Sequence, residues 1–185
     1  MSKNFYQKYE EGSARDRAKL IFNHYCSFKG IIEDCEARLI YEIKSEEQFS
    51  RSHNRDELGV RIQNLGHHSD PTANEAVSNV LLKESVNGNG QIELNGQVSL
   101  DVKLRLERKH HILIVMKEEY NVFDKHLYSL MPEDQKIIIP LLMHSKDYYE
   151  IAKDFGQSIE CIRKRASRIR RSFIEDITSY FVEKI

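Results

Sequence analysis

Residues 147–173 of this 185-residue chain, DYYEIAKDFGQSIECIRKRASRIRRSF, carry the local signals of two successive helices. Asp147 and Glu150 have the spacing of a capping box, in which two side chains bond the free N–H groups at the start of a helix. Gly156 is placed to end that short helix in a left-handed turn. Ser158 is then suited to cap a second, longer helix. A short capped helix, a tight turn and a longer helix together predict a helix-turn-helix.

The second helix of this unit is expected to carry an apolar stripe and a strongly basic outer surface. The whole chain has 28 Lys and Arg against 29 Asp and Glu, which gives a formal net charge of −1. A local excess of basic residues is therefore not a consequence of a generally basic composition. Between Gln157 and Ser172, however, the only acid is Glu160. A dense basic patch on a near-neutral chain points to a nucleic-acid partner. The expected stripe is Ile159, Ile162, Ala166, Ile169, Phe173 and Ile177, and the basic residues are Arg163, Lys164, Arg165, Arg168, Arg170 and Arg171.

Such a helix fits the major groove of double-stranded DNA, where base edges specify the sequence and phosphates supply most of the affinity. Glu160 would accept a hydrogen bond from a cytosine amino group, and Arg163 or Lys164 would donate to guanine. For Cys161, contact with a thymine methyl group and simple space filling both stay open. The predicted DNA-binding residues are Ser158, Glu160, Cys161, Arg163, Lys164, Arg165, Ser167, Arg168 and Arg171.

A further helix is expected just before this pair. Pro132 suits the first position of a helix, and Glu133 and Asp134 place acids in its positive first turn. Pro140 lies inside this helix, where it removes a hydrogen bond. We expect it to kink the helix at a cost of about 3 kcal/mol if nothing compensates.

The N-terminal part predicts two long helices, over about residues 14–43 and 99–128. Apolar residues recur in both at the steps of three and four that a helix requires. Packed antiparallel, the two stripes would bury each other in a helical hairpin, and they could instead pair across a dimer axis. The first stripe is Ile21, Tyr25, Phe28, Ile32, Cys35, Leu39 and Ile43, and the second is Ile112, Met116, Tyr120, Phe123 and Leu127.

The segment between these helices is less regular. Residues 45–70 are interpreted as a polar crossover. Asp70 and Pro71 then favour the start of a helix that runs to about Val86. The glycines and asparagines of residues 87–97 predict a loop.

Composition excludes several classes of protein. Only 3 prolines and 8 glycines, with 31% charged residues, favour a helical and water-facing chain. No apolar run approaches the roughly 18 residues that a membrane span needs. The first residues also lack the apolar core of an export signal. We therefore expect a cytoplasmic location and no membrane partner.

The sequence predicts no cofactor and no metal site. The cysteines form no CxxC pair and are interpreted as ordinary thiols. Adjacent histidines on a helix point about 100° apart, whereas zinc needs three or four convergent ligands, so the histidine pairs are assigned to the surface or the core edge. A glycine-rich phosphate loop, a nucleophile elbow and an HExxH motif are all absent, which favours a protein without enzymatic activity. The residues concerned are Cys26, Cys35, Cys161, His67–His68 and His110–His111.

Residues 130–173, LMPEDQKIIIPLLMHSKDYYEIAKDFGQSIECIRKRASRIRRSF, resemble region 4 of bacterial sigma factors. In that pattern a leucine-proline-acid start and an apolar helix precede Y-x-E-I-A-x-x-x-G-x-S and a basic helix. Nothing in the chain resembles the sigma region that melts promoter DNA, so a complete sigma factor is not expected. The matching positions are Tyr148, Glu150, Ile151, Ala152, Gly156, Ser158, Ile162, Arg165 and Arg168.

The whole chain is similar to the ArpU/RinA-type late-transcription regulators of phages and prophages of Gram-positive bacteria. Those proteins join a helical N-terminal part to a sigma-region-4-like C-terminus, and residues 59–77, GVRIQNLGHHSDPTANEAV, carry the similarity in the middle of the chain. The resemblance implies DNA binding near promoters, activation of late or packaging genes, and a cytoplasmic location at the nucleoid of a bacterial host cell.

The sequence thus predicts an all-α protein, with a long N-terminal helical hairpin plus a C-terminal sigma-region-4-like helix-turn-helix. Residues 1–128 are expected to form a helical oligomerisation region, and residues 129–185 the DNA-binding domain. Double-stranded DNA is the expected partner, with RNA polymerase and a second copy of the chain in a homodimer as further candidates. Two alternatives stay open, namely a small-terminase-like DNA-packaging component and a protein adaptor that docks on RNA polymerase.

Overall fold

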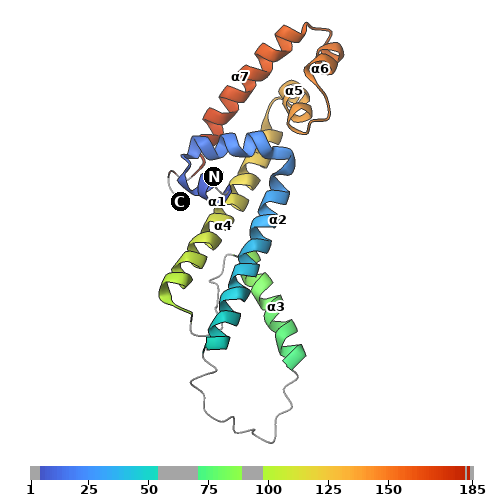
Figure 1. Cartoon of the computed structure of the whole chain (residues 1–185). Helices are drawn as coiled ribbons and strands as arrows, with labels where there is room; N and C mark the ends of the chain where they lie inside the picture. Colours follow the sequence, from blue (N-terminus) through green and yellow to red (C-terminus); the bar gives the residue numbers. More distant parts are fainter. Residues whose placement is uncertain (1–4, 54–70, 89–97, 182, 184–185) are drawn as a thin grey trace, which may run out of the picture. The chain divides into compact units, whose positions relative to one another are not determined.

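A computed structural model describes residues 5–53, 71–88, 98–181 and 183 of the chain. Within these ranges every regular element is an α-helix, which confirms the predicted all-α class. The helices are α1 (Phe5–Glu11), α2 (Ala14–His53), α3 (Pro71–Asn87), α4 (Leu100–Ser129), α5 (Pro132–Leu142), α6 (Tyr148–Phe155) and α7 (Ile159–Thr178) (Figure 1).

The chain forms two compact units, and α2 and α4 each contribute to both of them. The first unit comprises Met1–Ile32 and Val115–Ile185, and the second comprises Glu33–Ile114. The predicted boundary between residues 128 and 129 therefore lies inside the first unit. This difference arises because the C-terminal helices share aromatic contacts with α2 and α4.

Phe173 of α7 packs among aromatic rings in the core of the first unit. Its ring lies 4.8 Å from that of Phe123 and 6.3 Å from that of Phe22, measured between centroids. Phe28 stacks on Tyr120 at 5.4 Å. Such aromatic pairs add to the free energy of simple area burial. The predicted apolar stripes are confirmed here by burial of Ile21, Tyr25, Phe28, Ile32, Met116, Tyr120, Phe123 and Leu127.

Helix α2 is kinked inside the first unit. His24 has φ −115° and ψ 15°, outside the helical region, and the bend is visible in Figure 1. The Ser27 hydroxyl donates to the His24 carbonyl oxygen at 3.2 Å, which satisfies an acceptor at the break. The predicted stripe continues across the kink, because Ile21 before it and Tyr25 after it are both buried.

The second unit confirms the rest of both stripes. Cys35, Leu39 and Ile43 of α2 are buried, as is Ile112 of α4. His110 is also buried, and its Nε2 lies 3.3 Å from the Val86 carbonyl oxygen, which agrees with a core-edge histidine. The other histidine pair, His67–His68, lies outside the described residues.

The prediction of a crossover from residue 45 is wrong for residues 45–53, which continue α2. The polar appearance of this stretch was misleading because Glu47 and Ser50 are buried on the helix. Glu46 is also paired with Arg105 of α4, at 2.8 Å between Oε1 and Nη2. Residues 54–70 and 89–97, with most of the predicted crossover and loop and the Asp70 cap, lie outside the described residues. The helix predicted over 71–86 is confirmed as α3.

Helix α1 was not predicted, because no motif before residue 14 indicates a helix. Its buried residues are Tyr6 and Tyr9. Among the described residues, none of the helices has the length and apolar character that crossing a membrane requires.

Candidate nucleic-acid interface

Three successive helices, α5, α6 and α7, form the C-terminal part of the first unit (orange to red in Figure 1). Pro132 is at the start of α5, and Glu133 and Asp134 lie in its first turn, as predicted. Pro140, which we expected to kink this helix, does not interrupt it, because α5 continues through Leu142. Pro140 lies in the last turn, where its carbonyl oxygen accepts from the Ser145 N–H at 3.0 Å.

The capping box of α6 is confirmed. An Asp147 oxygen accepts from the Glu150 N–H at 2.8 Å, and a Glu150 oxygen accepts from the Asp147 N–H at 2.9 Å. Gly156 ends the helix with φ 61° and ψ 31°, the left-handed conformation that glycine adopts without a Cβ penalty. Ser158 then caps α7, since its hydroxyl accepts from the Cys161 N–H at 3.3 Å.

Helix α7 packs against both α5 and α6. Ala152 of α6 is buried, and its small side chain is compatible with close packing of α6 on α7. The predicted stripe of α7 is confirmed, since Ile159 is half-buried and the other members are buried, namely Ile162, Ala166, Ile169, Phe173 and Ile177.

The guanidinium of Arg165 is bound by α5. Its Nη2 lies 2.8 Å from an Asp134 oxygen and 2.9 Å from a Glu133 oxygen, and its side chain is 25% exposed. The hydrogen bonds that Arg165 donates to Glu133 and Asp134 raise its pKa above the usual range. The group also lies over the Phe155 ring at 5.9 Å. Arg165 thus joins α5, α6 and α7, and its Nε and Nη2 donors are already in use.

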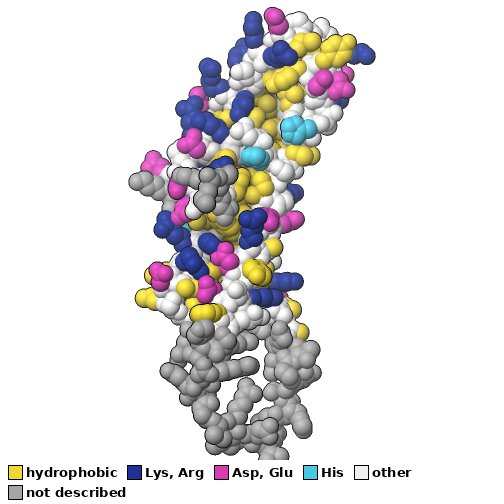
Figure 2. All heavy atoms as spheres, in the orientation of Figure 1, with side chains coloured by type: hydrophobic (Ala, Val, Ile, Leu, Met, Phe, Trp, Pro, Cys, Tyr) yellow, Lys and Arg dark blue, Asp and Glu magenta, His cyan; other side chains and the backbone are white. Residues whose placement is uncertain are grey.

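Three basic residues of α7 differ from Arg165 in their surroundings. Lys164, Arg168 and Arg171 are exposed, and within the described part of the chain none has an ion-pair partner. Their spacing of four and three places them in a row along the helix. Figure 2 shows Lys and Arg side chains along the edge of the molecule that α7 forms. This row, Lys164, Arg168 and Arg171, is called the outer row below.

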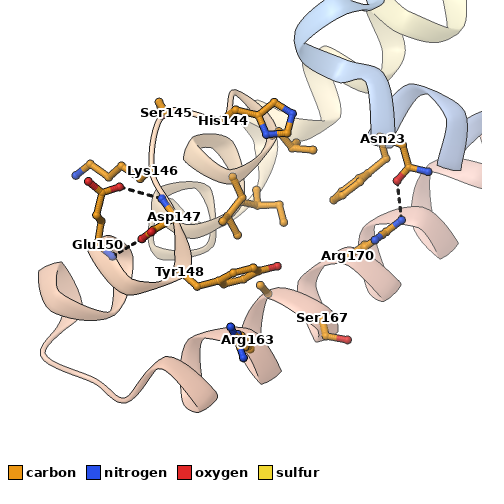
Figure 3. Close-up of a pocket in the computed structure, with 15 residues that line it drawn as sticks. Asn23, His144, Ser145, Lys146, Asp147, Tyr148, Glu150, Arg163, Ser167 and Arg170 are labelled. Carbon is orange, nitrogen blue, oxygen red and sulfur yellow. Dashed lines mark hydrogen bonds between the residues drawn. The ribbon is translucent and has the colours of Figure 1, made fainter.

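Arg163 and Arg170 form the basic wall of a cavity beside α7 (Figure 3). Arg163 lies 5.6 Å from the centre of the Tyr148 ring. Arg170 donates to Asn23 Oδ1 at 2.8 Å and lies 4.8 Å from the centre of the Phe22 ring. Ser167 lies between them in sequence and lines the same cavity.

The remaining predicted site residues lie near the start of α7. Glu160 is exposed in the first turn, where a carboxylate is favoured by the helix dipole. Cys161 is exposed, with its Sγ 3.6 Å from Gln157 Oε1, so it fills no interior space. Ser158 is exposed and serves as the helix cap.

Three residues of this region were not among the predicted site residues, namely Phe22, Asn23 and Arg170. The spacing of Arg163, Ser167 and Arg170 on one helical row was available as a signal. The contact of Arg170 with Asn23 was not, because the two residues are 147 positions apart. No cluster of His, Cys, Asp and Glu able to hold a metal ion occurs among the residues that the structure describes.

Comparison of the chain with protein-family models, with curated proteins and with solved structures gives no significant match.

Proposed function

We propose that the chain is a sequence-specific DNA-binding transcription regulator, without enzymatic activity, that activates phage or prophage late genes. The proposal is supported by the capped α6, the left-handed turn at Gly156 and the capped, basic α7. These are the parts of a helix-turn-helix whose second helix enters the major groove. The resemblance to sigma region 4 and to ArpU/RinA-type regulators supplies the proposed genetic role and the cytoplasmic location.

The outer row is the observation that carries this proposal. An exposed guanidinium or ammonium without a carboxylate partner keeps its charge available for a phosphate. Phosphate contacts supply a large share of affinity for DNA. Glu160 and Lys164, near the start of α7, are the residues best placed for base edges, since the first turns of a recognition helix face the bases. In this proposal Arg165 orients α7 by its bonds to α5.

A binding experiment tests the proposal directly. Selection from a random DNA library would identify a preferred site, and affinity for that site and for random DNA would then be measured over a salt series. Replacement of the outer row by alanine should flatten the log–log salt slope by about 0.9 for each phosphate that is no longer neutralised. Removal of a hydrogen bond to a base edge should cost about 1–3 kcal/mol on the preferred site alone.

A matched variant controls for net charge. Lys8, Lys29 and Lys125 are exposed lysines on α1, α2 and α4, so their replacement by alanine also removes three positive charges. This control should change the slope much less than the outer-row variant does. Equal effects of the two variants, or unchanged binding by the outer-row variant, would defeat the assignment. Complete absence of salt-dependent binding would favour the protein adaptor that docks on RNA polymerase.

A small-terminase-like packaging component is the second candidate, because such proteins couple a helix-turn-helix to oligomerising helices. One observation favours it: the second unit exposes large apolar side chains that could pair with another copy. Light scattering separates the candidates, since a closed ring favours packaging, whereas a monomer or dimer that raises transcription from one promoter favours the regulator. The exposed side chains are Val77, Val80, Leu81, Leu100 and Leu104.

A further inference from the structure

The cavity beside α7 has the size and the mixed lining of a small-molecule site. Its volume is about 810 Å³, within the range of about 300–1,000 Å³ typical of ligand pockets. Residues from α2, α5, α6 and α7 line it, all within the first unit. Figure 2 shows hydrophobic side chains beside the basic edge of α7 in this region. The apolar part of the lining is Phe22, Ile138, Leu141, Leu142 and Ala166.

The basic wall of the cavity is held in place before any ligand binds. One nitrogen of Arg170 donates a hydrogen bond to Asn23, and the guanidinium lies over the Phe22 ring. A guanidinium has five N–H donors, so most of its donors remain for an anion. Arg163 is positioned over Tyr148, whose ring extends from α6 toward the cavity in Figure 3. Neither arginine has an ion-pair partner among the described residues.

The two acids at the cavity, Asp147 and Glu150, are fixed at the start of α6 by bonds that leave their charges in place. Asp147 and Glu150 bond each other's backbone N–H groups in the capping box of α6. Lys146, which also lines the cavity, pairs with Asp154 at 2.6 Å. The polar groups left for a ligand include two arginines, the His144 ring and the Ser167 and Tyr148 hydroxyls, beside an apolar surface.

We propose that this cavity binds an amphipathic organic anion. Its carboxylate, sulfonate or phosphate group would pair with Arg170 and Arg163, and its apolar body, of one or two rings or a short acyl chain, would lie against Phe22 and Leu141. Arginine suits this role because its planar fork makes paired, charge-assisted hydrogen bonds to such groups. The site is independent of the proposed function, since it can be measured without DNA.

A pair of fluorescent probes isolates the role of the anion. Anilinonaphthalene sulfonate has two aromatic ring systems and a sulfonate, whereas phenylnaphthylamine lacks only the sulfonate. Both fluoresce in apolar sites, and the chain has no tryptophan to interfere. The full chain should bind the sulfonate saturably at one site, and more tightly than it binds the neutral probe.

Adjacent arginines provide matched variants. Arg170 lines the cavity, whereas Arg171 belongs to the outer row and does not line it. Arg170→Gln should weaken binding of the sulfonate by about tenfold or more, because one charge-assisted interaction is removed. Arg171→Gln should change it by no more than about twofold, since an exposed distant charge is screened. The neutral probe should bind both variants as it binds the parent.

Three results would overturn the proposal: no saturable binding of the sulfonate, equal binding by the parent and Arg170→Gln, or equally weakened binding of both probes. Equal weakening of both probes would mean that Arg170 only holds α2 against α7 and does not bind the anion. Circular dichroism and thermal melting verify the fold of each variant. If Arg170→Gln lowers the melting temperature, Arg163→Gln provides the same comparison. Among the described residues the side chain of Arg163 is held only by the Tyr148 ring, so its replacement should disturb the fold less.

Discussion

The guanidinium of Arg17 and the carboxylate of Glu119 form a buried ion pair between α2 and α4. Arg17 Nη2 lies 2.8 Å from Glu119 Oε1, and Nε lies 3.0 Å from Oε2, with side chains 0% and 5% exposed. Tyr9 of α1 donates its hydroxyl to Oε2 at 2.5 Å, and Arg17 Nη1 donates to the Gly12 carbonyl oxygen at 3.0 Å. One carboxylate thus holds α1, α2 and α4 together.

Removal of the carboxylate should strongly destabilise the protein. Glu119→Gln removes the negative charge of the buried pair while Arg17 stays fully buried, and the expected cost is about 3–5 kcal/mol in the free energy of unfolding. Urea denaturation measures it. The exposed pair Arg38–Asp34, at 2.9 Å, is the control, because Asp34→Asn should cost less than about 1 kcal/mol. Similar costs in the two variants would contradict a dominant role for the buried pair.

The same network makes stability sensitive to alkaline pH. Burial raises the pKa of Tyr9, and the Glu119 charge raises it further. The unfolded chain loses this proton at about pH 10, whereas the folded chain keeps it. The free energy of unfolding therefore falls as the pH rises above that value. One such tyrosine contributes a slope of up to about 1.4 kcal/mol per pH unit.

Tyr9→Phe isolates this contribution. Its stability should be lower than that of the parent near neutral pH, because the bond to Glu119 is removed, yet it should decline less steeply above about pH 10. Between about pH 7 and pH 9 the two curves should be parallel, since Tyr9 keeps its proton in both states of the parent. Curves that stay parallel above pH 10, approximately, would assign the alkaline decline to other groups.

Features that depend on near neighbours in sequence were predicted correctly. Asp147, Gly156 and Ser158 act on backbone groups within a few residues, so their spacing alone indicates their roles. The buried stripes followed from periodicity for the same reason. The partners of Arg17 could not be predicted, because Glu119 is 102 positions away and a fully buried arginine is rare.

The candidate site shows the same limit. Arg165 and Lys164 are adjacent basic residues, and composition gives no reason to treat them differently. Only the packing of α7 on α5 brings Arg165 to Asp134, which is 31 positions away. The cavity likewise depends on Asn23 reaching Arg170. Charge density along the sequence therefore located the basic helix, and tertiary packing decided which of its cations stay available.

Two glycines should respond to alanine with opposite signs. Gly156 has φ 61°, so Gly156→Ala should lower the free energy of unfolding by about 1–2 kcal/mol. Gly30 lies inside α2 with nothing within 4 Å of an added Cβ, so Gly30→Ala should raise it by about 0.5–1 kcal/mol. Thermal melting of both variants provides the comparison. A more stable Gly156→Ala variant would show that the left-handed turn is not required.

Arg165 and Arg168 should differ in their effect on stability. Arg165→Gln removes bonds to Asp134 and Glu133, and since these groups are partly exposed the expected cost is about 1 kcal/mol in the free energy of unfolding, measured by urea denaturation. Arg168→Gln removes the same charge from an exposed position and should stay within about 0.5 kcal/mol of the parent. Arg165→Lys keeps the charge without the planar fork, so it should restore only part of the stability.

The same two variants should show the reverse order on DNA. Arg168→Gln should flatten the log–log salt slope of binding by about 0.9, the effect of one phosphate left without its cation. Arg165→Gln should leave the slope close to that of the parent at a temperature where both variants are folded, because its guanidinium is already bound by α5. Should Arg165→Gln flatten the slope as much as Arg168→Gln does, Arg165 must leave its carboxylate partners to reach the phosphates, and the sequence-based prediction of Arg165 as a DNA-binding residue would hold.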